Sequence, residues 1–590
     1  MMRNQASVQP NARMLMNTDE DRKVKVWKPF FKLIATVRLP YWWIALCLVA
    51  TLSQGSIALL YPQYVQKILA GDISQGTMWI TIALLFGIGL TVSLVQFVAS
   101  ITSAKISLKF RKLIWEHLIH LPVPYYDANK PREMISRTTD DTTKLSDLFA
   151  RDLGNAISSI YLLIGTFVIL FSYDWRLAFV EALIIPLIIV LGIINGRLSF
   201  KWTNRVQASL AQLTEFLSEL LLNIPLIKTF TKENREDKRG KELIDKLYIT
   251  RLMYEVITKT LLLMNELISV LQTIIVIVLG IYLVSKDIIT LPIWIAFYLY
   301  AQGLTSTVTV VMSAWTNLKT CQGAARRITE ISMEPTEPYD AVSQAKEING
   351  DLLFENVTFK YAENNILTNV SFIIPHGKVT AIIGPSGAGK STIFNLVERF
   401  YKPDTGEIKM GDHSIDDYNL QEWRKSIGCV SQETKLFSGT IRDNITYGID
   451  REIKEDEIIC AARAASAWDF ITAFDNGLDT EVGEVGSKLS GGQRQRIAIA
   501  RVILKDPEYV LLDEATSNLD AEAGYLVNQA LKKLCVGRTT IIIAHQLATI
   551  EAADQIIILS DEQVSGTGNH ESLLESNALY KRMIDIQQGI

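Results

Sequence analysis

The stretch VTAIIGPSGAGKST, residues 379–392, decides the fold of the second half of this chain. Its first residues are apolar and predict a buried strand that ends at Gly384, and a helix is expected to start at about Lys390. Gly384, Gly387 and Gly389 let the backbone between them curl, so that its N–H groups point inward. The pattern GxxxxGK[ST] between a strand and a helix predicts a loop that binds phosphate groups of a nucleotide.

Every residue of this loop is a candidate for nucleotide contact. Lys390 is expected to reach the β- and γ-phosphates, and the Ser391 hydroxyl is expected to bind Mg²⁺. The complete set of predicted contacts is Gly384, Pro385, Ser386, Gly387, Ala388, Gly389, Lys390, Ser391 and Thr392.

A second apolar strand is predicted in YVLLDEATSNLD, residues 509–520, and it ends in two carboxylates. Mg²⁺ takes oxygen ligands, which suits Asp513 at the end of a strand beside the phosphate loop. Glu514 is then placed to polarise an attacking water as a general base. The alternative is a pair of solvated acids at a strand end, and the neighbouring phosphate loop disfavours it.

Two more residues follow apolar segments and are expected near the same edge of the sheet. His545 ends the strand TTIIIAHQL, residues 539–547, where it can contact the γ-phosphate, although a lone histidine is more often structural. Gln432 ends the short apolar segment in CVSQETKLF and by itself indicates little. Strands that alternate with helices predict an α/β domain with a largely parallel sheet.

The first half of the chain is far more apolar than the second. A membrane-spanning helix needs about 20 apolar residues, and six segments qualify, so the fold expected for this half is a six-helix membrane domain. The predicted spans are residues 42–66, 78–101, 153–172, 176–196, 261–284 and 288–312. The predicted organisation is a cytoplasmic segment at 1–38, a membrane domain at 39–333, a linker at 334–350 and a nucleotide-binding domain at 351–590.

The distribution of Lys and Arg predicts the orientation of the spans. Positive residues collect before the first span and in the two long links, and the three short links carry few. The positive-inside rule then places both termini and both long links in the cytoplasm. We expect a multi-pass protein of a bacterial plasma membrane. The N-terminus lacks the apolar core of a secretory signal, and a net charge of −4 gives no indication of nucleic-acid binding.

The two long links between spans are predicted to be helical rods that extend the spans. Residues 105–121 and 197–223 contain neither Pro nor Gly, and apolar residues recur every three or four positions. Prolines break the rods at LPVPYYDANKP (121–131) and NIPLIKTF (223–230), which are expected to dock onto something cytoplasmic.

Carboxylates and cysteines in the chain leave alternatives open. Glu181 and Glu266 lie in the predicted spans, where charge is costly. Each is either an interfacial carboxylate or part of a water-filled substrate cavity. The five cysteines have no metal-binding spacing and are expected to be reduced packing residues.

Taken in order, GPSGAGKS, Gln432, LSGGQ (489–493), YVLLDE, SNLD and His545 resemble the nucleotide-binding domain of ATP-binding cassette (ABC) transporters. With six preceding spans, nearly the whole chain resembles an ABC exporter half-transporter. The resemblance implies that Ser490, Gly491, Gly492 and Gln493 cap the γ-phosphate of ATP held by a second copy, with Asp520 touching that opposite site. It further implies that Tyr361 stacks on adenine and that Gln432 joins Ser391 and Asp513 at the metal.

The resemblance also indicates how the two halves communicate. Tyr125, Tyr126 and Asp127 resemble a first coupling helix, residues 223–230 a second, and EVGEVGSK (481–488) the loop that meets them. Gln546 stands where the family often has Arg, and GTGNHESL replaces a GTHEEL-like end; neither touches the predicted chemistry.

The implied function is ATP-driven export of a drug, lipid or peptide across the bilayer, with ATP and Mg²⁺ as cofactors. A homodimer with two active sites is favoured over a heterodimer. The alternative function is an ATP-gated membrane sensor or regulator without net transport.

Overall fold

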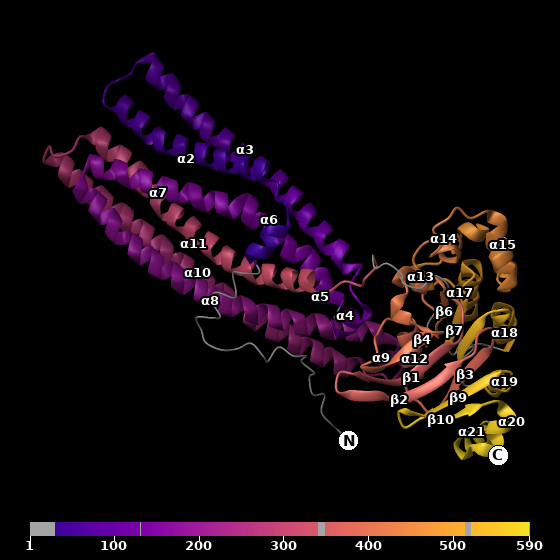
Figure 1. Ribbon diagram of the computed structural model, residues 1–590. Helices are drawn as coiled ribbons and strands as arrows, with labels where there is room; N and C mark the ends of the chain where they lie inside the picture. Colours follow the sequence, from indigo (N-terminus) through magenta and orange to yellow (C-terminus); the bar gives the residue numbers. More distant parts are fainter. Residues whose placement is uncertain are drawn as a thin grey trace. The chain divides into compact units, whose positions relative to one another are not determined.

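The computed structural model describes residues 30–129, 131–339, 348–432, 434–513, 521–544 and 546–588. Contacts within the chain divide it into two compact units (Figure 1). The first comprises Met1–His120 and Asn129–Glu334, and the second comprises Leu121–Ala128 and Pro335–Ile590. The short segment at Leu121–Ala128 therefore belongs with the second unit, although it lies within the first half of the sequence.

The first unit is entirely helical in its described part. Six of its helices are long and apolar enough to cross a membrane, which confirms the six predicted spans. Its elements are α2 (Tyr41–Leu69), α3 (Gln75–Leu118), α5 (Pro131–Ser136), α6 (Thr142–Asp147), α7 (Leu153–Tyr173), α8 (Trp175–Leu222), α9 (Ile224–Thr229), α10 (Glu233–Ser285) and α11 (Leu291–Met333), with π-helical turns at Arg137–Asp141 and Leu148–Asp152.

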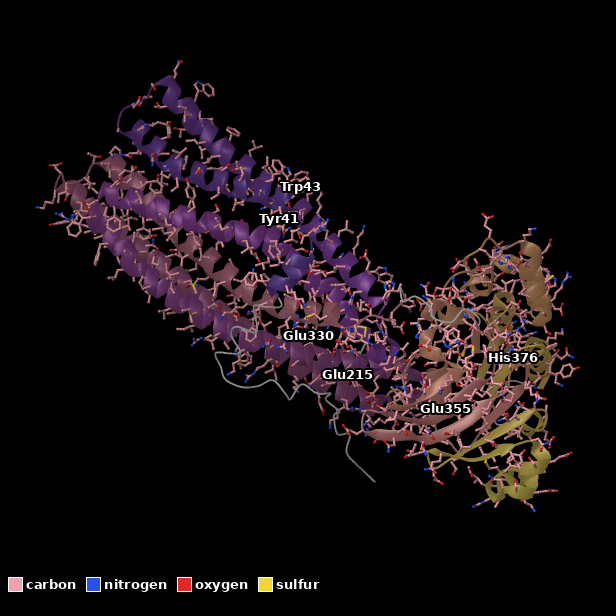
Figure 2. The ribbon with its side chains drawn as sticks, viewed as in Figure 1. Tyr41, Trp43, Glu215, Glu330, Glu355 and His376 are labelled. Carbon is pink, nitrogen blue, oxygen red and sulfur yellow. The ribbon has the colours of Figure 1, made fainter. Side chains whose placement is uncertain are left out.

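The outward faces of these helices suit a lipid environment. Large apolar side chains such as Phe86, Val168 and Leu183 are exposed, as expected where hydrocarbon replaces water around a helix bundle. At the start of α2, Tyr41 is exposed and the Lys105 ammonium lies 3.7 Å from the centre of the Trp43 ring (Figure 2). Aromatic rings and snorkelling lysines of this kind are typical of the membrane–water interface.

The long helices pack in pairs and extend well past the apolar spans. α2 lies along α3, α8 along α10 and α7 along α11 (Figure 1). α3 and α8 run unbroken from the spans through residues 105–118 and 197–222, which confirms the predicted rods. The proline-containing turns that end the rods form short helices, α4 (Val123–Ala128) and α9, because proline is accommodated in the first turn of a helix.

An ion pair fixes the C-terminal end of α11. Asp141 lies in a π-helical turn and is almost fully buried, and its two carboxylate oxygens accept hydrogen bonds of 2.6 and 2.7 Å from Arg327. Bidentate pairs of this kind are strong and directional. Around it, Ile106, Phe110 and Ile328 form a buried apolar cluster that joins α3 to α11.

The second unit contains a six-stranded and a four-stranded sheet. The larger has the order β10-β9-β3-β8-β7-β6, in which the five strands from β9 to β6 are parallel and β10 is antiparallel, and the smaller antiparallel sheet has the order β2-β1-β4-β5. This confirms the predicted α/β domain. The strands are β1 (Leu352–Tyr361), β2 (Asn364–Ile374), β3 (Val379–Ile383), β4 (Thr405–Met410), β5 (His413–Ser414), β6 (Ile427–Val430), β7 (Tyr509–Asp513), β8 (Thr539–Ile543), β9 (Gln555–Ser560) and β10 (Gln563–Gly568).

Helices cover these sheets and supply most of the remaining core. They are α12 (Lys390–Val397), α13 (Leu420–Lys425), α14 (Ile441–Thr446), α15 (Glu455–Ala464), α16 (Trp468–Thr472), α17 (Gly491–Lys505), α18 (Ala521–Cys535), α19 (Leu547–Glu551), α20 (His570–Ser576) and α21 (Ala578–Gln588), with 3-10 turns at Ile415–Asp417, Gly477–Asp479 and Glu484–Gly486. Part of the predicted linker is bound to this unit, because Glu337 accepts two 2.7 Å hydrogen bonds from Arg424.

Two expectations about single residues need correction. The packing role predicted for cysteines holds for the buried Cys47 and Cys321, but Cys429 and Cys460 are exposed. Cys429 lines a cavity of about 460 Å³ with Arg424 and Lys505, since β6 is the edge strand of its sheet.

Glu181 is buried among helices in this conformation, although either sequence-based expectation would place its carboxylate in contact with water. Its side chain is 1% exposed and lies between α8, α10 and α11, whereas Glu266 on α10 is exposed. Burial of Glu181 follows from helix packing, which the spacing of residues along one span does not reveal.

Candidate nucleotide-binding site

The loop between β3 and α12 has the backbone that its glycines predict. Gly384, Gly387 and Gly389 have φ values of +153°, +83° and +90°, in a region that side chains disfavour. A Cβ atom on Gly384 would lie 2.2 Å from the carbonyl oxygen of Leu559, and one on Gly389 would lie 2.9 Å from Leu367. Only glycine therefore permits this curl at either position.

The loop exposes some of its residues and buries others. Pro385, Ser386 and Gly387 are exposed, while Ala388, Gly389 and Lys390 are buried. The ammonium group of Lys390 donates hydrogen bonds of 2.9 and 3.0 Å to the carbonyl oxygens of Gly384 and Pro385. Ser391 is exposed at the start of α12 and Thr392 points into the core. The loop thus closes around the lysine.

The order of strands brings the other predicted site residues to the same edge of the sheet. β3, β8, β7 and β6 are parallel neighbours, so the phosphate loop, Asp513 at the end of β7 and Gln432 two residues after β6 all follow carboxyl ends of strands. Ligands of open α/β sheets bind outside these ends. Asp513 is half-buried and Gln432 is exposed.

Three predicted residues lie outside the described part of the chain. They are Glu514, Asp520 and His545. Next to two of them, Asp513 pairs with Ile543 across β7 and β8, and the N–H of Ala544 donates to the carbonyl oxygen of Ile382 on β3. The described chain therefore reaches residues 513 and 544 at the carboxyl ends of the neighbouring strands β7 and β8.

Tyr361 ends β1 and contacts the helix that follows the phosphate loop. Its hydroxyl accepts a 2.9 Å hydrogen bond from the Nδ2 atom of Asn395 on α12. Its ring makes an edge contact with Tyr401, with centroids 5.0 Å apart. The tyrosine predicted to stack on adenine is thus held by the phosphate-loop helix.

A half-buried carboxyl group, that of Glu398, directly follows α12. Burial raises the pKa of Glu398 to about 7, while Arg424, Lys505 and a hydrogen bond from the Cys429 thiol act in the opposite direction. The group is therefore poised to change charge near neutral pH.

The LSGGQ motif forms the start of α17 with a reciprocal capping arrangement. The Ser490 Oγ atom accepts a hydrogen bond from the backbone N–H of Gln493, and the Gln493 side chain accepts one of 2.9 Å from the backbone N–H of Ser490. Capping uses a lone pair of Ser490 and leaves its hydroxyl hydrogen available. The N–H groups of Gly491 and Gly492 open the helix and have no intrahelical acceptors, so this neutral helix start can donate to an anion.

Helix α4, with the predicted coupling residues, packs within the second unit. Leu121 just before it is buried, and the Asp127 carboxylate accepts a 2.5 Å hydrogen bond from the Tyr401 hydroxyl. Tyr125 and Tyr126 form an edge-on ring pair. The loop EVGEVGSK contains Val485, which is exposed with φ of +51°, an unfavourable conformation for a β-branched residue that is typical of functional loops.

Sequence reasoning missed two residues that this geometry brings in. Tyr401 bridges Tyr361 and Asp127, and Asn395 holds the Tyr361 hydroxyl. No motif signals either residue, because each acts through a contact between segments that are distant in sequence.

Comparisons with known proteins now decide the family. The ABC transporter transmembrane region model matches residues 44–308, and the ABC transporter model matches residues 367–517. The multidrug resistance ABC transporter ATP-binding and permease protein of Lactococcus lactis subsp. cremoris is 33% identical over 95% of this chain and 96% of its own length. This chain is an ABC transporter.

Other relatives of this ABC transporter are named for different substrates. The ATP-dependent lipid A-core flippase of Photorhabdus laumondii subsp. laumondii is 32% identical over 88% of this chain and 90% of its own length. The ABC-type oligopeptide transporter of Homo sapiens is 33% identical over 82% of this chain and 64% of its own length.

The family assignment settles the general activity. The chain is an exporter-type half-transporter, an integral membrane protein that binds and hydrolyses ATP to move a substrate across a lipid bilayer. The predicted family, fold class and enzyme activity are thereby confirmed.

Proposed function

We propose that this ABC transporter is a homodimer that exports hydrophobic or amphipathic molecules from the cytoplasm of a bacterial cell. Each ATP is held between the phosphate loop of one copy and the LSGGQ motif of the other. ATP draws the two nucleotide-binding domains together, the cytoplasmic rods carry that movement to the spans, and hydrolysis resets the cycle. To shift the conformational equilibrium substantially, ATP must favour the closed state by several kcal/mol.

The observation that carries this proposal is the capped start of α17. Ser490 keeps a hydroxyl hydrogen to donate, and Gly491 and Gly492 add backbone N–H groups. Within one chain, the phosphate loop and α17 pack into different apolar clusters, around Ile393 and Ile497 respectively. A second copy is the natural source of a phosphate for an anion-binding helix start that carries no charge of its own.

The residues at the carboxyl edge of the sheet suit Mg²⁺ and ATP chemistry. Ser391, Gln432 and Asp513 offer oxygen atoms, the ligands that Mg²⁺ prefers, and would hold the ion beside the phosphates. The ion supplies positive charge that offsets the charge of the phosphate oxygens.

The remaining predicted residues complete the site. Lys390 binds the β- and γ-phosphates, Glu514 takes a proton from the attacking water, and His545 contacts the γ-phosphate. Tyr361 stacks on adenine and Asp520 touches the opposite site.

Helix α9 gives further support for a second copy. Ile224, Leu226 and Phe230 are all exposed there, so an apolar face at the end of the α8–α10 rod is available for docking. We propose that it meets the nucleotide-binding domain of the partner. Lys and Arg in the rods support the proposal that this end, both termini and the nucleotide-binding domain face the cytoplasm.

Reconstitution of the purified chain into lipid vesicles tests the function. ATP should drive accumulation of an amphipathic dye, a labelled lipid or a peptide, and the stimulating compound identifies the cargo class. Activity of this chain without any other protein is expected of a homodimer. ATP hydrolysis without movement of any tested cargo favours the alternative sensor or regulator, and hydrolysis only with a second, different chain favours a heterodimer.

A further inference from the structure

One carboxyl group lies in the membrane-spanning bundle without a counter-charge. The Oε2 atom of Glu181 accepts a 2.7 Å hydrogen bond from the Nε2 atom of Gln272 on α10. Within the described part of the chain, its Oε1 atom is buried and has no hydrogen-bond partner. The group therefore has a single neutral hydrogen bond in place of its hydration shell.

The amide of Gln272 is fixed by its own contacts. Its Nε2 atom also donates to the carbonyl oxygen of Ala301 at 3.0 Å, and its Oε1 atom accepts a 2.9 Å hydrogen bond from the Thr305 hydroxyl on α11. Gln272 consequently presents its NH₂ group to Glu181 and cannot present a second donor. Three helices thus close around the carboxyl group.

Among the described residues, no charged group of the helices packed against Glu181 pairs with it. α7, α10 and α11 contact α8. Arg176 lies near the start of α8, with its guanidinium 5.7 Å from the Trp175 ring centre, and Glu266 on α10 is exposed. Among the described residues no ion pair or further hydrogen bond reaches Glu181 from the other titratable groups of these spans, which are Tyr161, Tyr173, Tyr282, Tyr298 and Tyr300.

An ionised carboxylate in this position loses far more solvation than one hydrogen bond returns, whereas the neutral acid loses little. We propose that Glu181 is a proton-binding site of the transport cycle. It carries a proton while α8, α10 and α11 are packed as they are here. When the helices separate, its O–H bond breaks, the electron pair stays on the carboxylate, and water takes the proton as hydronium; this second step rests on the proposed transport cycle.

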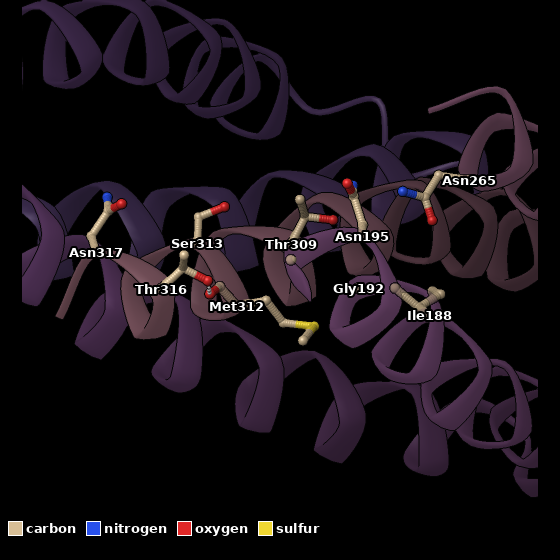
Figure 3. A pocket seen from close by; sticks show the side chains of 10 residues that line it. Ile188, Gly192, Asn195, Asn265, Thr309, Met312, Ser313, Thr316 and Asn317 are labelled. Carbon is tan, nitrogen blue, oxygen red and sulfur yellow. Dashed lines mark hydrogen bonds between the residues drawn. The ribbon is translucent and has the colours of Figure 1, made fainter. Parts of the chain in front are cut away.

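A cavity of about 220 Å³ formed by the same three helices offers the route to water (Figure 3). Ile188 lies seven residues after Glu181 on α8, Asn265 seven before Gln272 on α10, and Thr309 four after Thr305 on α11. α8 and α11 run antiparallel to α10, so residues later on α8 and α11 and earlier on α10 all lie in the same direction along the bundle. At 1.5 Å per residue, seven residues place the cavity about 10 Å from Glu181. Asn195, Asn265 and Ser313 supply polar groups in its wall.

Infrared difference spectroscopy of the full chain in lipid tests the protonated state. All variants carry Glu398→Gln, because Glu398 also holds a proton near neutral pH. In this background the carbonyl band of a protonated carboxylic acid is expected with Glu181 intact, here called wild type, and in Glu266→Gln, the matched control, and should be missing in Glu181→Gln. The proposal is wrong if the band is absent from wild type or persists in Glu181→Gln. Thr305→Val keeps Glu181 but releases Gln272, so the pH at which the band disappears should rise; an unchanged titration overturns the role of the Gln272 contact.

The pH dependence of the conformational equilibrium tests the link to the cycle. One proton per chain changes that equilibrium at most 10-fold per pH unit, so wild type and Glu266→Gln should share a pH-dependent rate of ATP-driven transport that Glu181→Gln lacks. Identical pH profiles in all three proteins contradict the link. Absence of transport in wild type, with the infrared band present, refutes the proposed export and leaves the proton site intact.

Discussion

The hydroxyl of Tyr401 donates a 2.5 Å hydrogen bond to the carboxylate of Asp127. Asp127 lies on α4, and the Tyr401 ring contacts Tyr361, the residue predicted to stack on adenine. Burial and the neighbouring Asp127 raise the pKa of the Tyr401 hydroxyl above its usual range, so the bond is intact at physiological pH. One side chain thus connects α4 with the edge of the predicted nucleotide site.

Tyr401→Phe should weaken this connection and leave the ring contacts in place. Asp127 is exposed, so we expect a loss below the usual range for a hydrogen bond to a charged group, about 1 kcal/mol, or roughly fivefold in the docking equilibrium of α4. Hydrogen exchange should show faster opening of α4, and fewer cargo molecules should move per ATP hydrolysed. Tyr525→Phe, at an exposed tyrosine of α18, serves as control; equal exchange in α4 of both variants contradicts the prediction.

Glu514→Gln should separate ATP binding from hydrolysis. Loss of a general base is expected to slow turnover by roughly 10²–10⁴-fold, while the phosphate loop and Asp513 keep their contacts. Nucleotide binding and phosphate release, measured on the same purified protein, give both quantities. Turnover equal to wild type would remove Glu514 from the proposed mechanism.

Ser490→Arg tests whether each site is shared between two copies. In a tandem-linked dimer with the substitution in one half, the site that carries the Lys390 of the other half should fail. Trapping of labelled nucleotide in each half identifies the failing site. Ser490→Ala is the milder variant and should cost about 1 kcal/mol through loss of the helix cap. If the failing site is instead the one that carries the mutated half's own Lys390, the sites are not shared between two copies.

Glu398 should make the stability of the protein fall as pH rises. Burial holds its pKa at about 7 in the folded state, against 4.5 for an ordinary glutamate. Between these values the folded chain keeps a proton that the unfolded chain has released, so the free energy of unfolding decreases with increasing pH, by up to about 3 kcal/mol. Thermal unfolding of the full chain between pH 5 and 8 measures this change.

Glu398→Gln should flatten that pH dependence, and Glu422→Gln, at an exposed glutamate of α13, should not. A wild-type unfolding midpoint that rises through this range, or equal slopes in both variants, contradicts the assignment.

The features that the sequence predicted well depend on local patterns. The six spans follow from length and apolarity, and the phosphate loop follows from three glycines that must adopt positive φ. The sequence did not predict contacts between segments that are distant along the chain. Nothing around Glu181 indicates that Gln272 lies beside it, and nothing around Tyr401 indicates Asp127. Cys429 looked like a packing residue because its apolar neighbours do not reveal that β6 is an edge strand.

The cap at Ser490 has a kinetic consequence for the proposed dimer. Because the Ser490 Oγ atom accepts from the backbone N–H of Gln493, and the Gln493 side chain accepts from the backbone N–H of Ser490, the loop has little rotational freedom left to lose when a phosphate arrives. A preorganised donor set of this kind needs no rearrangement on contact. The rate at which two copies close around ATP should then depend on the movement of whole domains, and the LSGGQ loop itself should stay rigid during that movement.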